Sequence, residues 1–374
     1  MQQILYLIQK EFRQVFRDKP MLFIVFFSPL VQMIVLGFAI TIDVTNVKTV
    51  IVDYDKTPVS REIARKFEHN PYFSVRGYFD GPSEVRRQID GWKAQIAIVI
   101  PPDFSRDLQR RQTPQIQIVV DGLDGNTAGI ALGYAQGILT DYAVQVIQQQ
   151  KSPTTSAQAG AIIDAETRMW YNLDLESKNF MVPGLIAVLL TVVSMFLSSM
   201  ALVREKELGT LEQLMVTPVK IWQLILGKVM PFLLLSFLAL SIMLTVAFVV
   251  FQLTVQGSIF LLFVISALYL FSTLGLGIFI STLAQTQQQA MFISWFFIVF
   301  LIFLSGFLFP IENMPEIIQR LTYLNPMRYY VIVVREIFLK GSSVKFLLNE
   351  ILSLISFGLV IFGLSSVKFH KRVS

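Results

Sequence analysis

Side chains able to catalyse a reaction or to hold a metal are scarce in this sequence. Cysteine is absent, and the two histidines, His69 and His370, lie far apart along the chain. These counts exclude disulfides, thiolate chemistry and a zinc site. Four aspartates beside predicted strands could bind a cation, although aspartate at a strand end more often forms a turn: Asp53, Asp55, Asp121 and Asp124.

Three glutamates lie in the segment 204–228, which begins R-E-K-E-L-G-T-L-E-Q-L-M-V-T-P. Leu208, Leu211 and Leu214 recur with helical spacing and predict a short amphipathic helix that ends at Pro218. Such a helix either lies flat on a membrane surface or docks a protein partner. The glutamates would give a docking surface negative charge: Glu205, Glu207 and Glu212.

The composition indicates what must hold these residues in place. Apolar residues make up 54% of the 374 residues and charged residues 15%, against roughly 25% charged in an average soluble protein. The mean hydropathy is +0.60. So few charges cannot cover the surface of a soluble protein, so the sequence predicts a membrane protein. The net charge of +5 does not by itself indicate nucleic-acid binding, and none is expected.

Six apolar segments are long enough to cross the roughly 30 Å hydrocarbon core of a bilayer as helices. The first five contain no Asp, Glu, Lys or Arg, and the sixth contains only Glu350. The sequence therefore predicts an α-helical polytopic membrane protein with six transmembrane helices. The predicted spans are Met21–Ile42, Met181–Val203, Val229–Phe251, Ile259–Leu283, Ala290–Phe309 and Phe346–Val367.

Six spans place both termini on the same side of the membrane. Eleven Lys and Arg residues lie in the segments 1–20, 204–228 and 368–374, which the positive-inside rule assigns to the cytoplasm. Residues 43–178 join the first and second spans, so we expect them to be extracytoplasmic. The expected organisation is an N-terminal elbow helix and span one in 1–42, the outer domain in 43–178, and spans two to six in 179–374.

The N-terminal segment has the pattern of an amphipathic elbow helix lying in the membrane interface. Leu5 and Phe12 share an apolar face, and Lys10 and Arg13 lie on the opposite, basic face. Residues 18–20 read Asp-Lys-Pro and interrupt the path into span one. We expect the basic face to lie against lipid phosphates.

Residues 43–178 are more highly charged than the spans and have mixed periodicity. Predicted strands and helices alternate, which indicates a compact α/β domain. A long helix follows, and a polar linker over 151–160 leads toward span two. The predicted strands are Val47–Val52, Ala94–Ile100 and Gln115–Val120; the predicted helices are Thr57–Glu68, Ser83–Gly91, Pro102–Arg111 and Asn126–Gln149.

Glycine recurs every fourth residue along this long helix, at Gly125, Gly129, Gly133 and Gly137. A row of small residues allows another backbone to approach closely. The row either packs against the sheet of its own domain or forms a contact face for a partner subunit.

The segment 204–218 resembles the first cytoplasmic loop of ABC-2 type transporter permeases, whose signature is E-x-E-x-G-T-x-E-x-L-x-x-x-P. The matching residues are Glu205, Glu207, Gly209, Thr210, Glu212, Leu214 and Pro218. The order of elbow helix, span, large outer domain and five more spans also resembles that family. So do the motifs between the last two spans: Leu304-Ser305-Gly306-Phe307, Phe309-Pro310, Met314-Pro315, Asn325-Pro326, Tyr329-Tyr330 and Leu339-Lys340-Gly341.

This resemblance implies the membrane subunit of a bacterial drug-efflux-type exporter in the inner membrane. Such a permease pairs with a second copy or a paralogue, and each permease binds an ATP-hydrolysing ABC subunit through its first cytoplasmic loop. ATP and Mg would belong to that partner, because this chain has no G-x-x-x-x-G-K-[ST] sequence, and no cofactor is expected on it. A periplasmic adaptor protein is a further partner to consider. The expected cargo is hydrophobic or amphipathic, moved out of the cytoplasm or inner leaflet.

The segment 310–345 is too apolar for a free loop between the last two spans. We expect it to form two short helices that re-enter the outer leaflet, where irregular backbone must be satisfied by protein or water. Its turn-forming and aromatic residues include Pro310, Pro315, Pro326 and Tyr329.

Span five carries an aromatic face formed by Phe292, Phe296, Phe303 and Phe307. The face could form a dimer seam by ring stacking, meet lipid, or line an apolar substrate path. The resemblance favours the seam, because permeases of this family pair through their first and fifth spans.

Two other functions fit parts of the sequence. An ion-coupled secondary transporter would need carboxylates or histidines deep in its spans, and a membrane-anchored sensor or scaffold would make use of the outer domain. A few polar span residues could line a transport path or could instead hydrogen-bond neighbouring helices: Ser28, Gln32, Ser194, Ser198 and Ser199.

Overall fold

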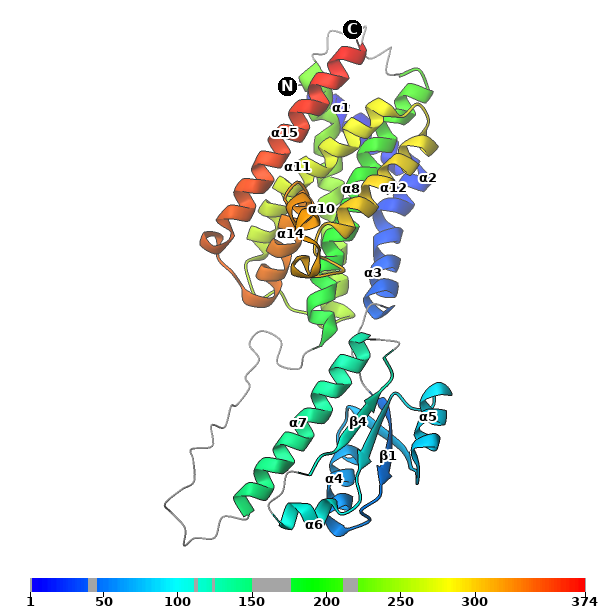
Figure 1. The fold of residues 1–374 in the computed structure, drawn as a ribbon. Helices are drawn as coiled ribbons and strands as arrows, with labels where there is room; N and C mark the ends of the chain where they lie inside the picture. Colours follow the sequence, from blue (N-terminus) through cyan, green and yellow to red (C-terminus); the bar gives the residue numbers. More distant parts are fainter. Residues whose placement is uncertain are drawn as a thin grey trace. The chain divides into compact units, whose positions relative to one another are not determined.

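The computed structural model describes residues 2–39, 46–110, 114–122, 125–149, 176–210 and 221–373. These residues fall into two compact units, shown as ribbons in Figure 1. One unit combines Met1–Thr41 with Arg168–Ser374 and is helical. The other unit, Ile42–Thr167, contains strands and helices.

The α/β unit is built on a four-stranded sheet formed by β1 (Val47–Asp53), β2 (Phe73–Tyr78), β3 (Ile96–Ile100) and β4 (Gln117–Val120). The strand order is β2-β1-β3-β4. β1 is parallel to both of its neighbours, and β4 is antiparallel to β3. Ile51 lies opposite Ile98 in this register, and both side chains are fully buried.

Four helices accompany the sheet: α4 (Pro58–Glu68), α5 (Pro82–Asp90), α6 (Phe104–Gln109) and α7 (Gly125–Gln149). α4 and α7 cover one face, where Phe67 and Ala135 share a core with Ile51. α5 covers the other face, where Val85 packs with Val50. α4 begins at a capping box, because Thr57 and Ser60 each accept a hydrogen bond from the other's backbone N–H.

The sequence predicts three of these strands and all four helices to within two residues of their observed ends. It does not predict β2. The partner of Thr49 is Val75 and the partner of Val50 is Gly77, so Arg76 is an extra residue that bulges from this edge strand. The bulge interrupts the alternation of apolar residues by which a half-buried strand is usually detected.

The helical unit consists of α1 (Gln2–Arg17), α2 (Lys19–Leu22), a π-helical turn (Phe23–Phe27), α3 (Ser28–Ala39), α8 (Ser177–Glu207), α10 (Ile221–Val249), α11 (Ile259–Leu283), α12 (Gln287–Phe303), α13 (Glu316–Thr322), α14 (Pro326–Arg335) and α15 (Leu348–Val373). Within the described residues, five helical stretches are long and apolar enough to cross a membrane, so the chain is a polytopic membrane protein. They are Lys19–Ala39, Ser177–Glu207, Leu226–Val249, Ile259–Leu283 and Val344–Ser365.

α8 forms the centre of the helical unit. From Val182 to Val203 every side chain except those of Phe196 and Met200 is buried. Helices α3, α10, α11, α12 and α14 all pack against it (Figure 1). A helix that is apolar on all sides is typical either of a protein core or of a membrane span, and α8 is enclosed by other helices of the same chain.

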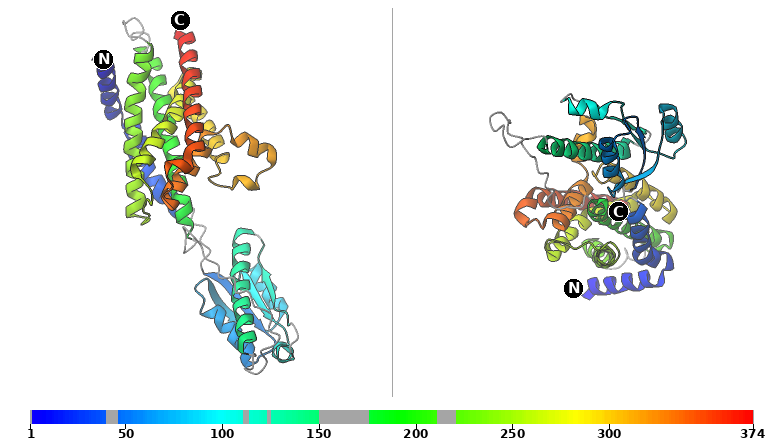
Figure 2. Two further views of the ribbon diagram at one scale, coloured as in Figure 1. Left: turned by 90° about the vertical axis from the view of Figure 1, so that its left-hand side faces the viewer. Right: turned by 90° about the horizontal axis from the view of Figure 1, so that it is seen from below.

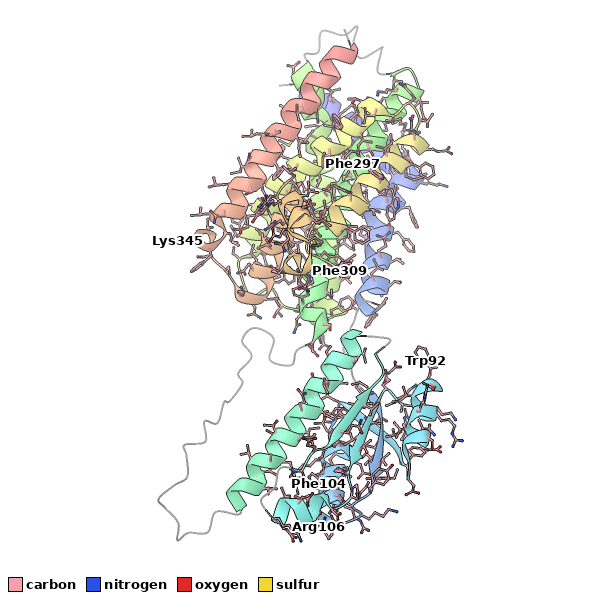
Figure 3. The ribbon with its side chains drawn as sticks, in the orientation of Figure 1. Trp92, Phe104, Arg106, Phe297, Phe309 and Lys345 are labelled. Carbon is pink, nitrogen blue, oxygen red and sulfur yellow. The ribbon has the colours of Figure 1, made fainter. Side chains whose placement is uncertain are left out.

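The predicted fifth span is shorter than expected. The sequence predicts a helix to Phe309, but α12 ends at Phe303, and Leu304 is its C-cap. Gly306 has φ = 76°, a left-handed conformation that favours glycine and turns the chain out of the helix. Figure 3 labels Phe297 within α12 and Phe309 beyond its end.

α1 lies crosswise to the long helices of its own unit. The right-hand view of Figure 2 shows α1 lengthwise while several of the long helices are seen end-on. Leu5, Tyr6 and Phe16 are exposed, whereas Glu11 and Val15 are buried against the protein. The expected division into an apolar and a basic face is therefore too simple, because the face that packs on the protein contains a carboxylate.

Candidate coupling site at one end of helix α8

The four charged residues Arg204–Glu207 form the last turn of α8, and the residues that follow them end the helix. Leu208 is the C-cap, and the Gly209 N–H donates to the carbonyl of Lys206 at 3.1 Å. Gly209 has φ = 66°, a conformation in which glycine commonly ends helices. The Thr210 hydroxyl lies 3.3 Å from the Glu205 carbonyl, to which it donates.

Glu205 belongs to a buried cluster of two carboxylates and two ammonium groups. Its carboxylate accepts from Lys10 of α1 and lies 2.7 Å from Nζ of Lys228 of α10. Lys228 also lies 2.9 Å from Glu11, and Lys10 lies 3.4 Å from Glu11. Relative exposure is 1% for Glu205 and Glu11 and 2% for Lys228, so three of the four charges are shielded from solvent.

The ammonium group of Lys10 responds to this environment. Burial by itself lowers the pKa of Lys10, but the carboxylates of Glu205 and Glu11 outweigh burial and hold that pKa above its ordinary value. Lys10 therefore stays charged at physiological pH. Two positive and two negative groups then compensate one another inside the protein.

The charged residues on either side of Glu205 bind other elements. Arg204 forms an ion pair with Asp18. Asp18 is the N-cap of α2, and its carboxylate also accepts from the Met21 N–H at 3.3 Å. Arg204 therefore fastens the end of α8 to the junction between α1 and the first span.

Lys206 and Glu207 bind the two helices that follow α10. The Lys206 ammonium donates to backbone carbonyls at the end of α11, including that of Ala284 at 3.4 Å. The Glu207 carboxylate accepts from the backbone N–H of Gln287 at 2.8 Å and from its side chain, at the start of α12. Each charge matches the helix end it meets, since cations suit C-termini and anions suit N-termini.

The predicted residues of the loop differ in how far the structure buries them. Glu205 is directed into the protein, which corrects the expectation that it faces a partner, whereas Glu207 is exposed. Glu212, Leu214 and Pro218 lie outside the described residues. Glu11 was not among the predicted site residues, because its only signal in the sequence is that it is the single acid in a basic helix. Lys10 was expected to face lipid, but it binds Glu205.

A comparison with known protein families decides what kind of protein carries this site. The family model described as ABC-2 family transporter protein matches residues 19–367. The chain belongs to this family. The match includes the end of α8 and the segment 310–345 that carries the second group of motifs.

Three relatives agree with this assignment. The "Probable multidrug ABC transporter permease YbhR" of Escherichia coli is 34% identical over 98% of both chains. The "Probable multidrug ABC transporter permease YbhS" of the same organism is 32% identical over 97% of this chain and 96% of its own. The "Inner membrane transport permease YhhJ" is 28% identical over the same shares. This ABC-2 family chain is therefore similar to permeases along nearly its whole length.

The ABC-2 chain forms two short helices in the segment 310–345, as the sequence predicts. Ile317 and Leu321 on α13 are exposed, whereas Tyr330 and Val334 on α14 are buried. The prolines mark helix starts: Pro310 is the N-cap of the 3-10 turn Ile311–Asn313, Pro315 is the N-cap of α13, and Pro326 opens α14. Tyr329 donates to the Tyr323 carbonyl at 3.1 Å.

Arg335, at the end of α14, holds the break after α12 in place. Its guanidinium donates to the carbonyls of Phe180 at 3.3 Å, Gly306 at 3.1 Å and Phe307 at 3.2 Å. It also lies 3.5 Å from the centroid of the Phe180 ring. The carbonyls of Gly306 and Phe307, which lie beyond the end of α12, therefore have a donor within the protein.

Three of the four phenylalanines predicted to form the aromatic face of span five are exposed. Phe292, Phe296 and Phe303 are 70%, 68% and 52% exposed. Phe307 is buried, because it follows the helix break and packs on Gly184 of α8, where a Cβ would lie 2.5 Å from its ring. Phe307 therefore belongs to the protein core rather than to this face.

Several polar residues of the spans hydrogen-bond other helices. Ser194 donates to Thr273 of α11 at 2.8 Å, and Ser294 of α12 donates to Ser199 at 3.0 Å. Ser198 donates to the Ser194 carbonyl within α8 at 2.9 Å. The contacts of Ser194 and Ser199 favour bonding between helices over a polar path, the bond of Ser198 stays within α8, and Ser28 and Gln32 are half-buried on α3.

Asp53, at the end of β1, makes the hydrogen bonds of a turn. Asp53 accepts from the N–H groups of Asp55 and Lys56 and from the hydroxyl of Ser60. No group of three or more potential ligands occurs among the residues that the structure describes. Asp121 immediately follows β4, and Asp124 lies outside the described residues.

The glycine row of α7 does not pack on its own sheet. Gly129, Gly133 and Gly137 are exposed, and a Cβ at any of them would meet nothing within 4 Å. Ala131 and Ala135 face the sheet instead. The expectation of an internal contact is therefore wrong, and a contact face for a partner stays a prediction.

Proposed function

We propose that this chain is the membrane subunit of an ATP-driven exporter that moves a hydrophobic or amphipathic substrate out of the cytoplasm or inner leaflet. The observation that carries the proposal is the end of α8. There, the first residues of the family motif form a helix terminus that five neighbouring elements contact, with Glu207 and Leu208 exposed at its tip. A well-supported, exposed helix end suits a surface that receives force from a partner. ATP and Mg are then held by a separate ABC subunit that docks on residues 204–228.

Six membrane crossings are part of the proposal, with α12 as the fifth. Seventeen residues of helix reach only about 25 Å at 1.5 Å per residue. The nonhelical residues after Phe303 extend this reach. Gln287 donates a hydrogen bond to Glu207 at one end of α8. At the other end, Arg335 donates to the backbone carbonyls of both Gly306 and Phe180. The stretch from Gln287 to Gly306 therefore runs the length of α8.

The proposed orientation puts the end of α8 with Glu205 in the cytoplasm. Lys10, Arg204, Lys206 and Lys228 gather at this end, where the positive-inside rule expects basic residues. Figure 1 shows α1 and the end of α15 at the same end of the helical unit. Residues 43–178 are then extracytoplasmic, and the segment 310–345 lies at the outer leaflet.

Pairing with a second copy or a paralogue is proposed through α12 and α3. Phe292 and Phe296 on α12 are exposed, as are Val35 and Phe38 on α3. Exposed apolar surface suits either a subunit contact or lipid, and the family resemblance favours the contact. An adaptor protein would be received by the outer domain.

Co-purification with the cognate ABC subunit and measurement of ATP hydrolysis in liposomes test this function. We expect a stable complex whose ATPase activity rises with transport substrate. Reversal of Glu207 and Glu212 to Lys should abolish association, whereas the matched reversal of Glu312 and Glu316, exposed at the other end of the unit, should not. Transport driven by an ion gradient without ATP would instead indicate a secondary transporter.

A further inference from the structure

Four consecutive charged residues at the end of α8 reach five different parts of the helical unit. Successive residues of a helix are about 100° apart, so four in a row cover its whole circumference. Because α8 is surrounded by other helices, each side chain meets a different neighbour. Arg204 meets Asp18, Glu205 meets α1 and α10, Lys206 meets α11, and Glu207 meets α12.

Glu205 differs from the other three because it has no surface open to a partner. It is 1% exposed and lies within reach of both Lys10 and Lys228. Glu11 completes the charge balance by its contact with Lys228 at 2.9 Å. A carboxylate enclosed in this way cannot make the direct contact with an ABC subunit that its place in the motif suggests.

We infer that Glu205 is a positioning residue that joins the coupling loop to α1 and α10, so that displacement of the loop is passed to the elbow helix. This inference rests on the proposed function. It assigns the first glutamate of the motif to transmission within the chain and leaves partner binding to Glu207 and the residues beyond it.

The contacts of α1 explain why it must follow the end of α8. Lys10 and Glu11 bind the cluster near the middle of α1, and Asp18 binds Arg204 just after its end. One turn before Lys10, α1 also packs closely on α10, since a Cβ on Gly227 would lie 2.8 Å from Leu7. α1 is therefore fastened at two points about eight residues apart, which opposes both sliding and rotation.

Glu205→Gln in the full chain, purified with its ABC subunit, tests the inference. We expect the complex to form with wild-type affinity and with an unchanged KM for ATP. The substrate-stimulated kcat should fall at least tenfold, because the nucleotide site is intact but the loop no longer moves α1. Glu207→Gln makes the same change in charge two residues later and should weaken association instead.

Charge exchange separates positioning from simple folding damage. Glu205→Lys combined with Lys228→Glu keeps two charges of each sign and should recover at least half of the stimulated kcat that either single variant loses. If Glu205→Gln does not fold, two other variants test the inference. One is Glu205→Asp, which keeps the charge on a shorter side chain; the other is the charge-exchange variant. Recovery by the exchange supports the inference.

Two results would overturn the inference. One is wild-type stimulated turnover in Glu205→Gln; the other is loss of association in that variant with no recovery by charge exchange. Failure of the wild-type chain to bind any ABC subunit or to stimulate ATP hydrolysis is a different result, and it would contradict the proposed function itself.

Discussion

The two ends of α8 are fastened by different kinds of interaction. At Glu205, full charges meet full charges in a buried cluster with Lys10, Glu11 and Lys228. At the other end, Arg335 meets neutral groups, the three carbonyls named above and the Phe180 ring. The first arrangement depends on charge balance, so we expect it to tolerate an exchange of signs. The second depends on the flat, forked shape of guanidinium, for which no charge partner can compensate.

Lys228→Met should have the largest effect, because it unbalances the charged end. It leaves two buried carboxylates with only Lys10, and breaking a buried pair costs about 3–5 kcal/mol. We expect a large drop in the thermal midpoint of the detergent-solubilised chain. Glu11→Gln in addition removes one negative charge and should restore part of the loss. Equal stability of wild type and Lys228→Met would show that the cluster is not charge-coupled.

Arg335→Lys tests the carbonyl-bound end and should be less severe. The lysine ammonium group keeps the charge, but it lacks the flat, forked shape with which the guanidinium reaches three carbonyls at once. Each hydrogen bond to a charged group is worth roughly 1.5–3 kcal/mol. The thermal midpoint should fall, and proteolysis should increase near residues 304–309. Arg320→Lys, at an exposed site on α13, is the matched control and should be neutral. An unchanged Arg335→Lys variant would contradict the requirement for a fork.

Gly184→Ala probes the packing beside Arg335 and should cost about 1–2 kcal/mol through overpacking. The new Cβ would lie 2.5 Å from the Phe307 ring and 3.2 Å from Arg335. Phe307→Leu in the same chain should relieve the clash and raise the thermal midpoint again. If the single substitution is silent, the break after α12 is looser than the contacts indicate.

Lys56→Gln in the α/β unit should have the smallest effect and sets the baseline for the comparison. Lys56 pairs with Asp80 at 3.4 Å, but the two side chains are 69% and 93% exposed. Exposed ion pairs contribute at most about 1 kcal/mol, so the thermal midpoint should hardly change. A loss as large as that of Lys228→Met would mean that burial does not decide the strength of ion pairs here.

The sequence predicts much of the fold because apolar runs and periodicity are local properties. All five long candidate spans begin and end within a few residues of their predicted limits, whereas α12, which is not among them, is shorter than predicted. Its early end depends on Gly306 and on Arg335, which is 29 residues further along the chain. A pattern search within one span does not include that partner.

The charged cluster could not be predicted for the same reason. Lys10 and Glu205 are 195 residues apart, and Glu11 and Lys228 are 217 residues apart. The position of Lys10 in the helical pattern of α1 fits a solvated basic face equally well. Glu205 shares its motif with Glu207, and only the packing of α1 and α10 around α8 separates the buried carboxylate from the exposed one.

The residues of the cluster are translated at widely separated times, because they lie far apart along the chain. Lys10 and Glu11 leave the ribosome first and carry no net charge together. Glu205 then adds a negative charge that remains uncompensated until Lys228 is made, shortly before α10 enters the membrane. All four charges of the cluster are therefore present only after the start of α10 has been synthesised, so α1, α8 and α10 can form this neutral site only from that point on.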